Sequence, residues 1–148
     1  MRQEPVIIAV KLLVPDAQIP KLAKPGDAAF DLFSVEDCTL KPGEWHAVST
    51  GISIEIPAGY EGQVRPRSGL ALKHGVTVLN APGTIDSGYR GEVKTIMINH
   101  GKEPFEITKG MRISQLAIRK VPKALLEVVD ELDDSERGEG GFGSTGMR

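Results

Sequence analysis

The chain is poor in the residues and segments that mark several common classes of protein. Its only cysteine is Cys38, so neither an intrachain disulfide framework nor a C-x-x-C pair exists. The three histidines, His46, His74 and His100, lack the spacing of a metal motif, and we interpret them as surface or strand residues. A formal net charge of −2 argues against the large basic surface that non-specific nucleic-acid binding needs.

Long apolar segments are missing too. No apolar run approaches the roughly 18 residues that a membrane helix needs. The first residues do not form a basic region followed by an apolar stretch and a cleavage site, so the sequence carries no secretion signal. We therefore expect a cytoplasmic protein that has no membrane partner and does not bind nucleic acids directly.

Aromatic residues make up only 5% of the chain, whereas glycine (17) and proline (10) are abundant among its 148 residues. This composition favours many short strands separated by turns over a bundle of helices. The length predicts one domain. Because few aromatic side chains fill the core, we expect a small β domain that gains stability by association.

The apolar pattern supports an all-β domain. Ile52, Ile54 and Ile56 alternate with polar residues, as in a half-buried strand. Short apolar runs between turn signals predict further strands at residues 6–14, 45–49, 62–65, 76–80, 93–99, 105–108, 113–120 and 125–129. One short helix is predicted over residues 68–74, with Ser68 as its N-cap and Gly75 as its stop. Regularly spaced strands predict a closed or double-sheet architecture.

The most informative segment is residues 83–91, which lies between the apolar runs 76–79 and 93–98. Its position predicts a turn that joins two strands. It combines a carboxylate, Asp86, and a ring, Tyr89, with several glycines. An acid can hold a water, a ring can stack or shield, and glycine lets backbone approach a ligand closely. These residues alone leave open an ordinary glycine-rich hairpin tip with a solvated aspartate.

The C-terminal segment differs from the rest. After an acidic stretch, residues 137–146 contain five glycines, an arginine, a phenylalanine and two hydroxyl side chains. Glycine-rich segments do not fix a conformation unaided, so we expect residues 1–136 to form the β domain and residues 137–148 to form a flexible arm. The arginine and the hydroxyls could grip a phosphate and the ring could cover a base, although the P-loop pattern is absent.

Three more segments complete an ordered set: residues 28–34, 65–71 and 109–116. Together with residues 83–91 and 137–146, this set closely resembles the motifs of the trimeric dUTPase family (deoxyuridine triphosphate nucleotidohydrolase). The resemblance extends from about Ala28 to Gly146. Ala29-Phe30 stands where the family commonly has Gly and Tyr, whereas Asp31 and Ser34 are retained.

The resemblance implies a jelly-roll-like β-barrel or sandwich protomer with one short helix and a glycine-rich C-terminal arm. It also implies a homotrimer whose active sites are shared between subunits, with each arm closing over a neighbour's site. The implied reaction is hydrolysis of dUTP to dUMP and pyrophosphate with Mg²⁺, by attack of water on the α-phosphorus. Such an enzyme limits uracil incorporation into DNA and supplies dUMP for thymidylate synthesis.

The resemblance also assigns roles to individual residues. Asp86 is the expected general base, Tyr89 packs on the deoxyribose, and Asp31 contacts Mg²⁺ through water. Arg112 is expected to pair with an acid such as Asp31 and so to hold the site together. The implied substrate-binding residues are Arg67, Ser68, Gly69, Asn80, Thr84, Ile85, Asp86, Tyr89, Lys94, Gln115, Arg137, Phe142, Gly143, Ser144 and Thr145.

Other interpretations of the same motifs remain. A dCTP deaminase shares a related trimeric fold but needs an acid or base at the cytosine ring and donors fitted to its amino group. A bifunctional deaminase and hydrolase would combine both activities. A non-enzymatic trimer could sense dUTP or bind a partner, because fold alone does not guarantee activity. A structural jelly roll with glycine-rich loops would leave the motif set as coincidence.

Overall fold

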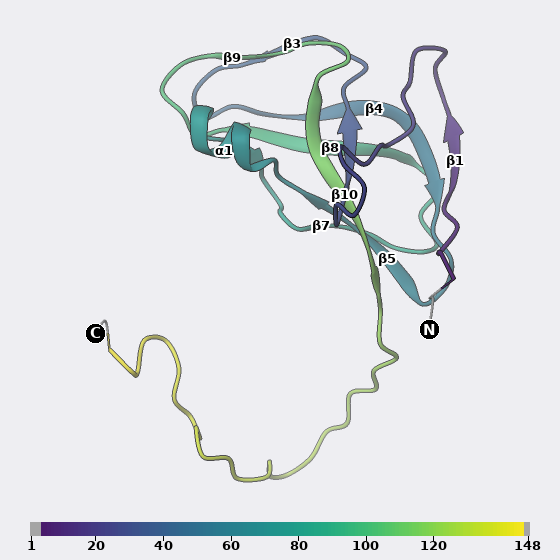
Figure 1. Cartoon of the computed structure of the whole chain (residues 1–148). Helices are drawn as coiled ribbons and strands as arrows, with labels where there is room; N and C mark the ends of the chain where they lie inside the picture. The colour runs from purple at the N-terminus through teal and green to yellow at the C-terminus, as the bar shows by residue number, and fades with distance from the viewer. Residues whose placement is uncertain (1–3, 147–148) are drawn as a thin grey trace.

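The computed structural model of the chain describes residues 4–146, and its folded body consists of short strands with one short helix (Figure 1). The elements in chain order are β1 (Ala9–Leu12), β2 (Phe30–Phe33), β3 (Cys38–Leu40), β4 (Trp45–Glu55), β5 (Tyr60–Arg65), α1 (Ser68–His74), β6 (Val76–Val78), β7 (Gly83–Ile85), β8 (Glu92–Asn99), β9 (Phe105–Ile107) and β10 (Arg112–Lys120). The predicted all-β class with one short helix is confirmed.

Two four-stranded sheets enclose the core. Their strand orders are β1-β4-β8-β6 and β2-β10-β5-β7, and β3 and β9 form a separate two-stranded ribbon. Every strand pairing in these sheets is antiparallel. Neighbours within a sheet are mostly distant in sequence, so the chain crosses repeatedly between the two layers, as in a jelly roll.

The alternating isoleucines behave as the sequence predicts. Ile52, Ile54 and Ile56 are all buried in the core, and the first two belong to β4. The helix also has the predicted span, and Gly75 ends it with a left-handed backbone at φ 67°. The predicted N-cap is wrong, because Arg67 occupies that position with extended backbone and Ser68 is already the first helical residue. No side chain caps the helix.

Two predicted strands are shorter or missing. Only Ala9–Leu12 of the predicted 6–14 strand is paired, and it pairs with β4. Residues 125–129 form no strand, and Leu125, Leu126 and Val128 are almost fully exposed. A strand needs a neighbour for its backbone N–H and C=O groups, and this segment lies beyond the folded body, where none is available within the described residues (Figure 1).

The predicted turn at residues 83–91 is more elaborate than a hairpin tip. β6 and β8 do pair antiparallel, with Val78 opposite Met97. The segment between them, however, contributes β7 to the opposite sheet, where it pairs with β5. Gly83 makes this approach feasible, because a Cβ there would already lie 3.3 Å from the Asn80 amide and 3.4 Å from the Val64 Cβ.

Polar groups inside the core are hydrogen-bonded. The fully buried hydroxyls of Thr95 on β8 and Ser114 on β10 lie 2.7 Å apart and join the two sheets. The buried Asn99 amide donates to the carbonyls of Leu40 and Glu103, both at 2.8 Å. These bonds connect the ends of β3 and β8 to the loop before β9.

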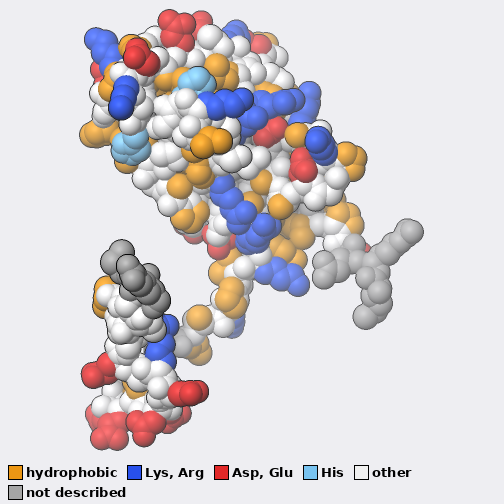
Figure 2. Space-filling view, turned by 60° about the vertical axis from the view of Figure 1, so that its left-hand side comes forward, with side chains coloured by type: hydrophobic (Ala, Val, Ile, Leu, Met, Phe, Trp, Pro, Cys, Tyr) orange, Lys and Arg blue, Asp and Glu red, His pale blue; other side chains and the backbone are white. Residues whose placement is uncertain are grey.

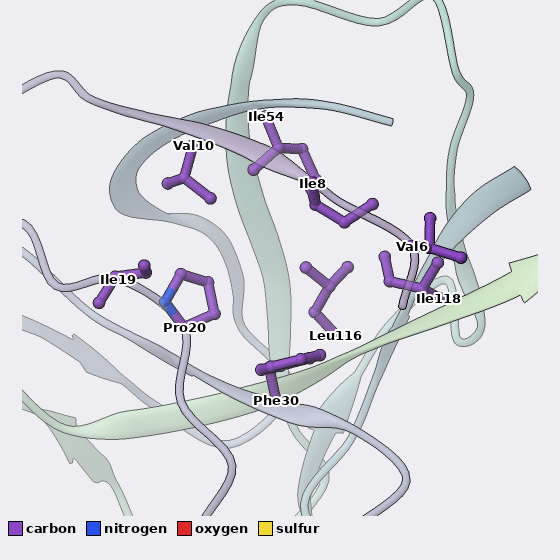
Figure 3. Close-up of a pocket in the computed structure, with 9 residues that line it drawn as sticks. All are labelled: Val6, Ile8, Val10, Ile19, Pro20, Phe30, Ile54, Leu116 and Ile118. Atoms are coloured by element: carbon purple, nitrogen blue, oxygen red, sulfur yellow. The ribbon is translucent and has the colours of Figure 1, made fainter. Parts of the chain in front are cut away.

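An apolar hollow of about 160 Å³ lies beside the N-terminal segment. Figure 3 shows Val6, Ile8 and Val10 on one side of it, with Phe30 and Leu116 on the other. Phe30 is 36% exposed and Val6 37%, so the fold leaves apolar side chains at the surface here.

The C-terminal segment leaves the body after β10. The amide of Val121 still donates to the Gly59 carbonyl at 2.8 Å, and beyond it the described chain forms an extended arc away from the sheets (Figure 1). The acidic side chains of residues 130–139 gather on this arc (Figure 2). Among the described residues the only helix has seven residues, too few to cross a membrane.

We predict that the Thr95–Ser114 bridge makes the two positions energetically coupled. Thr95→Val or Ser114→Ala alone leaves one buried hydroxyl without its partner, at a cost of about 1–3 kcal/mol each. The double variant removes both hydroxyls and should lose clearly less than the sum of the single variants. Urea unfolding of all four proteins at one concentration measures this coupling. If the losses in free energy of unfolding of the two single variants simply add in the double variant, the Thr95–Ser114 hydrogen bond does not couple the two positions.

Candidate active site

A first group of polar side chains lies across three neighbouring strands. The register places Gln115 of β10 opposite Asp31 of β2 on one side and opposite Arg65 of β5 on the other. Directly opposed residues share one face of a sheet. Asp31 is buried, whereas Gln115 and Arg65 are half-buried. A carboxylate, an amide and a guanidinium therefore form a row.

Arg112 pairs with Asp31 at one end of this row. Its Nε lies 3.5 Å from Oδ2 of Asp31, so the predicted ion pair is confirmed. Its guanidinium also lies 5.9 Å from the centre of the Phe33 ring, within range of a cation–π contact. The backbone carbonyl of Arg112 accepts a hydrogen bond from Nη1 of Arg67 at 3.2 Å. This last contact ties the start of α1 to β10, so Arg67 stands beside the row with Ser68 and Gly69 exposed next to it.

A second group surrounds an open hollow of about 590 Å³ between β7 and β8. Asp86 follows β7 directly and is exposed at this hollow, and Lys94 reaches it from β8. The amide of Tyr89 donates to the Asp86 carbonyl at 3.1 Å, which closes a turn and brings both side chains to the same rim. The full lining is Ala47, Thr84, Ile85, Asp86, Tyr89, Glu92, Val93, Lys94 and Ile96.

The Tyr89 ring is held in place by the backbone beside it. Its hydroxyl donates to the Glu92 carbonyl at 2.8 Å. The ring also lies against Gly91, where any Cβ would overlap its hydroxyl and its edge. With 46% of its surface exposed, the ring forms a wall of the hollow. The sequence predicted Tyr89 as a site residue, but it did not indicate that the absence of a side chain at Gly91 makes room for the Tyr89 ring.

Glu92 is a second residue that the sequence reasoning missed. Its Oε2 accepts the amide of Gly51 at 3.0 Å, and its Oε1 lies 4.0 Å from Nζ of Lys94. It therefore lies beside Lys94 at the hollow and bonds β4 where the pairing with β8 is irregular, between Ser49 and Ser53. No motif marks this residue in the sequence, because its partner in β4 becomes a neighbour only through folding.

One chain does not bring the two groups together. Arg65, opposite Gln115, is at the C-terminal end of β5, whereas Ile85, next to Asp86, is opposite Gly62. Three residues of strand separate these two positions, which is about 10 Å. Asn80 belongs with the second group, because its side chain packs against Gly83.

The predicted residues of the arm form a third group, apart from the other two. Nε of Arg137 donates to the Gly140 carbonyl at 2.6 Å, and the amide of Ser144 donates to the Gly141 carbonyl at 3.0 Å. Phe142 is fully exposed and has a left-handed backbone with φ 52°, which is uncommon for a bulky residue. Gly143 and Thr145 continue this exposed segment. Residues 147 and 148 of the predicted arm, and residues 1–3 of the predicted domain, lie outside the described residues.

Asp31 fits an indirect role toward Mg²⁺. Within residues 4–146 it belongs to no group of three potential metal ligands, and one of its oxygens faces Arg112. Mg²⁺ keeps several waters and takes oxygens from substrate phosphates, so a single carboxylate that accepts from those waters is a suitable partner.

Comparisons with known proteins agree with each other. Residues 15–146 match the family model described as dUTPase. The deoxyuridine 5'-triphosphate nucleotidohydrolase of Clostridioides difficile is 58% identical over 140 residues, covering 95% of this chain and 98% of that protein. A structure of Staphylococcus bacteriophage 80alpha dUTPase with dUPNHPP has a TM-score of 0.88 at 32% identity, covering 95% of this chain and 98% of that one. A mutant dUTPase from phage phi11 of S. aureus, described with a structural Mg(II) ion, has a TM-score of 0.80 at 25% identity, covering 86% and 99%.

Proposed function

Because the chain belongs to the dUTPase family, we propose that it hydrolyses dUTP to dUMP and pyrophosphate through a water that Asp86 activates for attack on the α-phosphorus. The observation that carries this proposal is the hollow between β7 and β8, where Asp86 and Tyr89 share one turn. Asp86 is exposed there, so a water can reach its carboxylate. A carboxylate in contact with one water can orient it and accept its proton, which is typically worth about 10²–10⁴-fold in rate.

The edge of β7 supports recognition of uracil. β7 is the last strand of its sheet, paired with β5 on one side only. The backbone N–H and C=O groups on the outer side of an edge strand can bond a ligand as they would bond another strand. Thr84 and Ile85 would present these groups to the base, close to Asn80 and Lys94. Because backbone in a paired strand yields little, it would clash with the methyl group of thymine, whereas a soft pocket discriminates one methyl by only about 1–3 kcal/mol.

The position of the Tyr89 ring supports selection of deoxyribose over ribose. The ring packs beside Gly91 and its hydroxyl donates to the Glu92 carbonyl, and these two contacts set the position of the ring. A ring packed on the sugar would leave no room for a 2′-hydroxyl.

The row of Asp31, Gln115 and their neighbours would receive the triphosphate. Gln115 offers an amide donor, Arg67 offers charge, and Ser68 and Gly69 are exposed beside them. Mg²⁺ on the phosphates would neutralise charge that develops during the reaction. Asp31 would accept hydrogen bonds from waters of that ion, and Arg112 keeps its carboxylate in place.

The separation of the two groups along β5 supports an active site shared between subunits. In one chain Asp86 lies at one end of β5 and Gln115 at the other. A second copy could bring its row next to the Asp86 hollow, as the proposed homotrimer requires. Exposed apolar side chains, including Trp45 at 63%, and the hollow of Figure 3 give such association an energetic reason.

We assign the arm the role of a lid. Arg137 would meet the γ-phosphate, Phe142 would cover the uracil, and Ser144 and Thr145 would add hydroxyl donors beside Gly143. Ordering costs about 1–2 kcal/mol per residue, so the arm would close only when a substrate supplies compensating contacts. In the cell, the reaction would limit uracil incorporation into DNA and supply dUMP for thymidylate synthesis.

We predict that pyrophosphate release is fast with dUTP and at background with UTP, dTTP and dCTP. Asp86→Asn should bind dUPNHPP with unchanged affinity in calorimetry, yet lose about 10²–10⁴-fold in turnover. Near-normal turnover of this variant would reject Asp86 as the base. Formation of dUTP from dCTP would instead favour a deaminase, and binding of dUPNHPP without pyrophosphate release by the wild-type protein would favour a non-enzymatic sensor.

A second prediction concerns the seat of the Tyr89 ring. Gly91→Ala should displace the ring, and the preference for dUTP over UTP, measured as a ratio of kcat/KM, should fall by roughly 10–200-fold. Gly88→Ala is the matched control, because a Cβ at that position meets nothing within 4 Å. Equal effects of the two substitutions would show that the ring position does not set sugar selection.

A third prediction tests the arm. Deleting residues 137–148 should leave the circular dichroism and the subunit number unchanged, because the described arm forms only local bonds. The value of kcat/KM for dUTP should fall by roughly 10²–10³-fold, because the donors that the closed arm would direct at the phosphates are lost. Glu139→Gln, at an arm position without an assigned contact, serves as the control. Retained kcat/KM in the truncated protein would exclude a lid.

A further inference from the structure

Three side chains with metal-ligand chemistry meet outside the hollow and the polar row. Nε2 of His46 lies 2.5 Å from Oε1 of Glu36, and the ligand atoms of Glu36, Cys38 and His46 all lie within 4.8 Å of one another. Cys38 begins β3 of the two-stranded ribbon, and His46 belongs to β4 of a four-stranded sheet. His46 is the exposed strand residue that the sequence predicts, and folding places two further potential ligands beside it that the sequence spacing does not show.

We propose that Glu36, Cys38 and His46 form a binding site for a divalent transition metal ion of the zinc class. Imidazole nitrogen, thiolate sulfur and carboxylate oxygen are the ligand types of Zn²⁺, and three protein ligands with one open position form a known arrangement. A tetrahedral ion with bonds of about 2.0–2.3 Å separates its ligand atoms by roughly 3.3–3.8 Å. The three ligand atoms all lie within 4.8 Å of one another, and the separation of His46 Nε2 from Glu36 Oε1 is 2.5 Å. Insertion of the ion requires Glu36 and His46 to part by about 1 Å, which their partial exposure permits.

The surroundings of the cluster favour a cation. The second oxygen of Glu36 accepts the amide of Ser49 at 3.0 Å, which orients the carboxylate as outer contacts do at metal sites. Asp37 lies between two of the proposed ligands in the chain, so the segment that carries Glu36 and Cys38 also carries a second acidic side chain.

The site differs from the Mg²⁺ chemistry of the proposed reaction. Mg²⁺ takes oxygen ligands and phosphates, whereas thiolate and imidazole select softer ions. None of the three side chains lines the hollow at Asp86. The β3–β9 ribbon shares no strand pairing with the sheet that contains β4. An ion at this position would therefore link the two.

Titration of the full-length, reduced protein with Co²⁺ and Zn²⁺ tests the proposal. We expect one Co²⁺ per chain with a thiolate-to-cobalt charge-transfer band, loss of the band when Zn²⁺ is added, and no loss with excess Mg²⁺. Since Cys38 is the only cysteine, a thiol reagent reports on this site alone, and Zn²⁺ should slow its reaction at least tenfold. A protein that gives no charge-transfer band and an unchanged thiol reaction rate overturns the proposal.

Two variants and a control identify the ligands. His46→Gln retains a hydrogen-bonding side chain toward Glu36 but should weaken Co²⁺ binding at least tenfold. Cys38→Ser should abolish the band. His100→Gln, at an exposed histidine outside the cluster, should leave affinity and band unchanged. If His46→Gln binds like the wild type, or if His100→Gln weakens binding equally, the ion lies elsewhere and the assignment is wrong. The wild-type thiol assay decides the matter even if Cys38→Ser does not fold.

Discussion

Strand β5 is hydrogen-bonded on both sides, and the register of these two pairings controls where the proposed site residues lie. β10 fixes Gln115 opposite Arg65, and β7 fixes Ile85 opposite Gly62. A slip of one residue in either pairing would turn every side chain of that strand to the other face. The two parts that each chain would contribute to the proposed shared sites, the Asp86 hollow and the polar row, therefore keep a fixed separation along a single strand.

Glycine acts in two opposite ways in this protein. At Gly62 it provides space, because a Cβ there would lie 3.0 Å from Ile56 Cδ1 and 3.1 Å from Leu116 Cδ1 in a closely packed core. Gly91 does the same for the Tyr89 ring at the surface. In the arm, glycine provides conformational freedom: Gly143 has φ 81° and open space around it. Glycine therefore permits close packing where neighbouring atoms are near, as at Gly62 and Gly91. It permits an unusual backbone conformation where the surroundings are open, as at Gly143.

Association is the natural complement of the isolated fold. In one chain Asp86 lies apart from the polar row that contains Asp31 and Gln115. Apolar side chains beside the N-terminal segment are exposed. In the described structure the arm makes no hydrogen bonds to the folded body. In the proposed trimer all three have one explanation, because a neighbouring copy supplies the missing face.

The family, the all-β class, the alternation in β4 and the helix at residues 68–74 could all be predicted from the amino-acid sequence, because they depend on local pattern and on the identity and order of reactive residues. It could also indicate Asp86 and Tyr89 by residue type. Three other features became known only from the folded chain: residues 83–85 cross to the opposite sheet, residues 125–129 stay unpaired, and His46 lies beside Glu36 and Cys38. Strand partners and ligand clusters join residues that are far apart in the chain, and a local pattern carries no information on which distant segment becomes the neighbour.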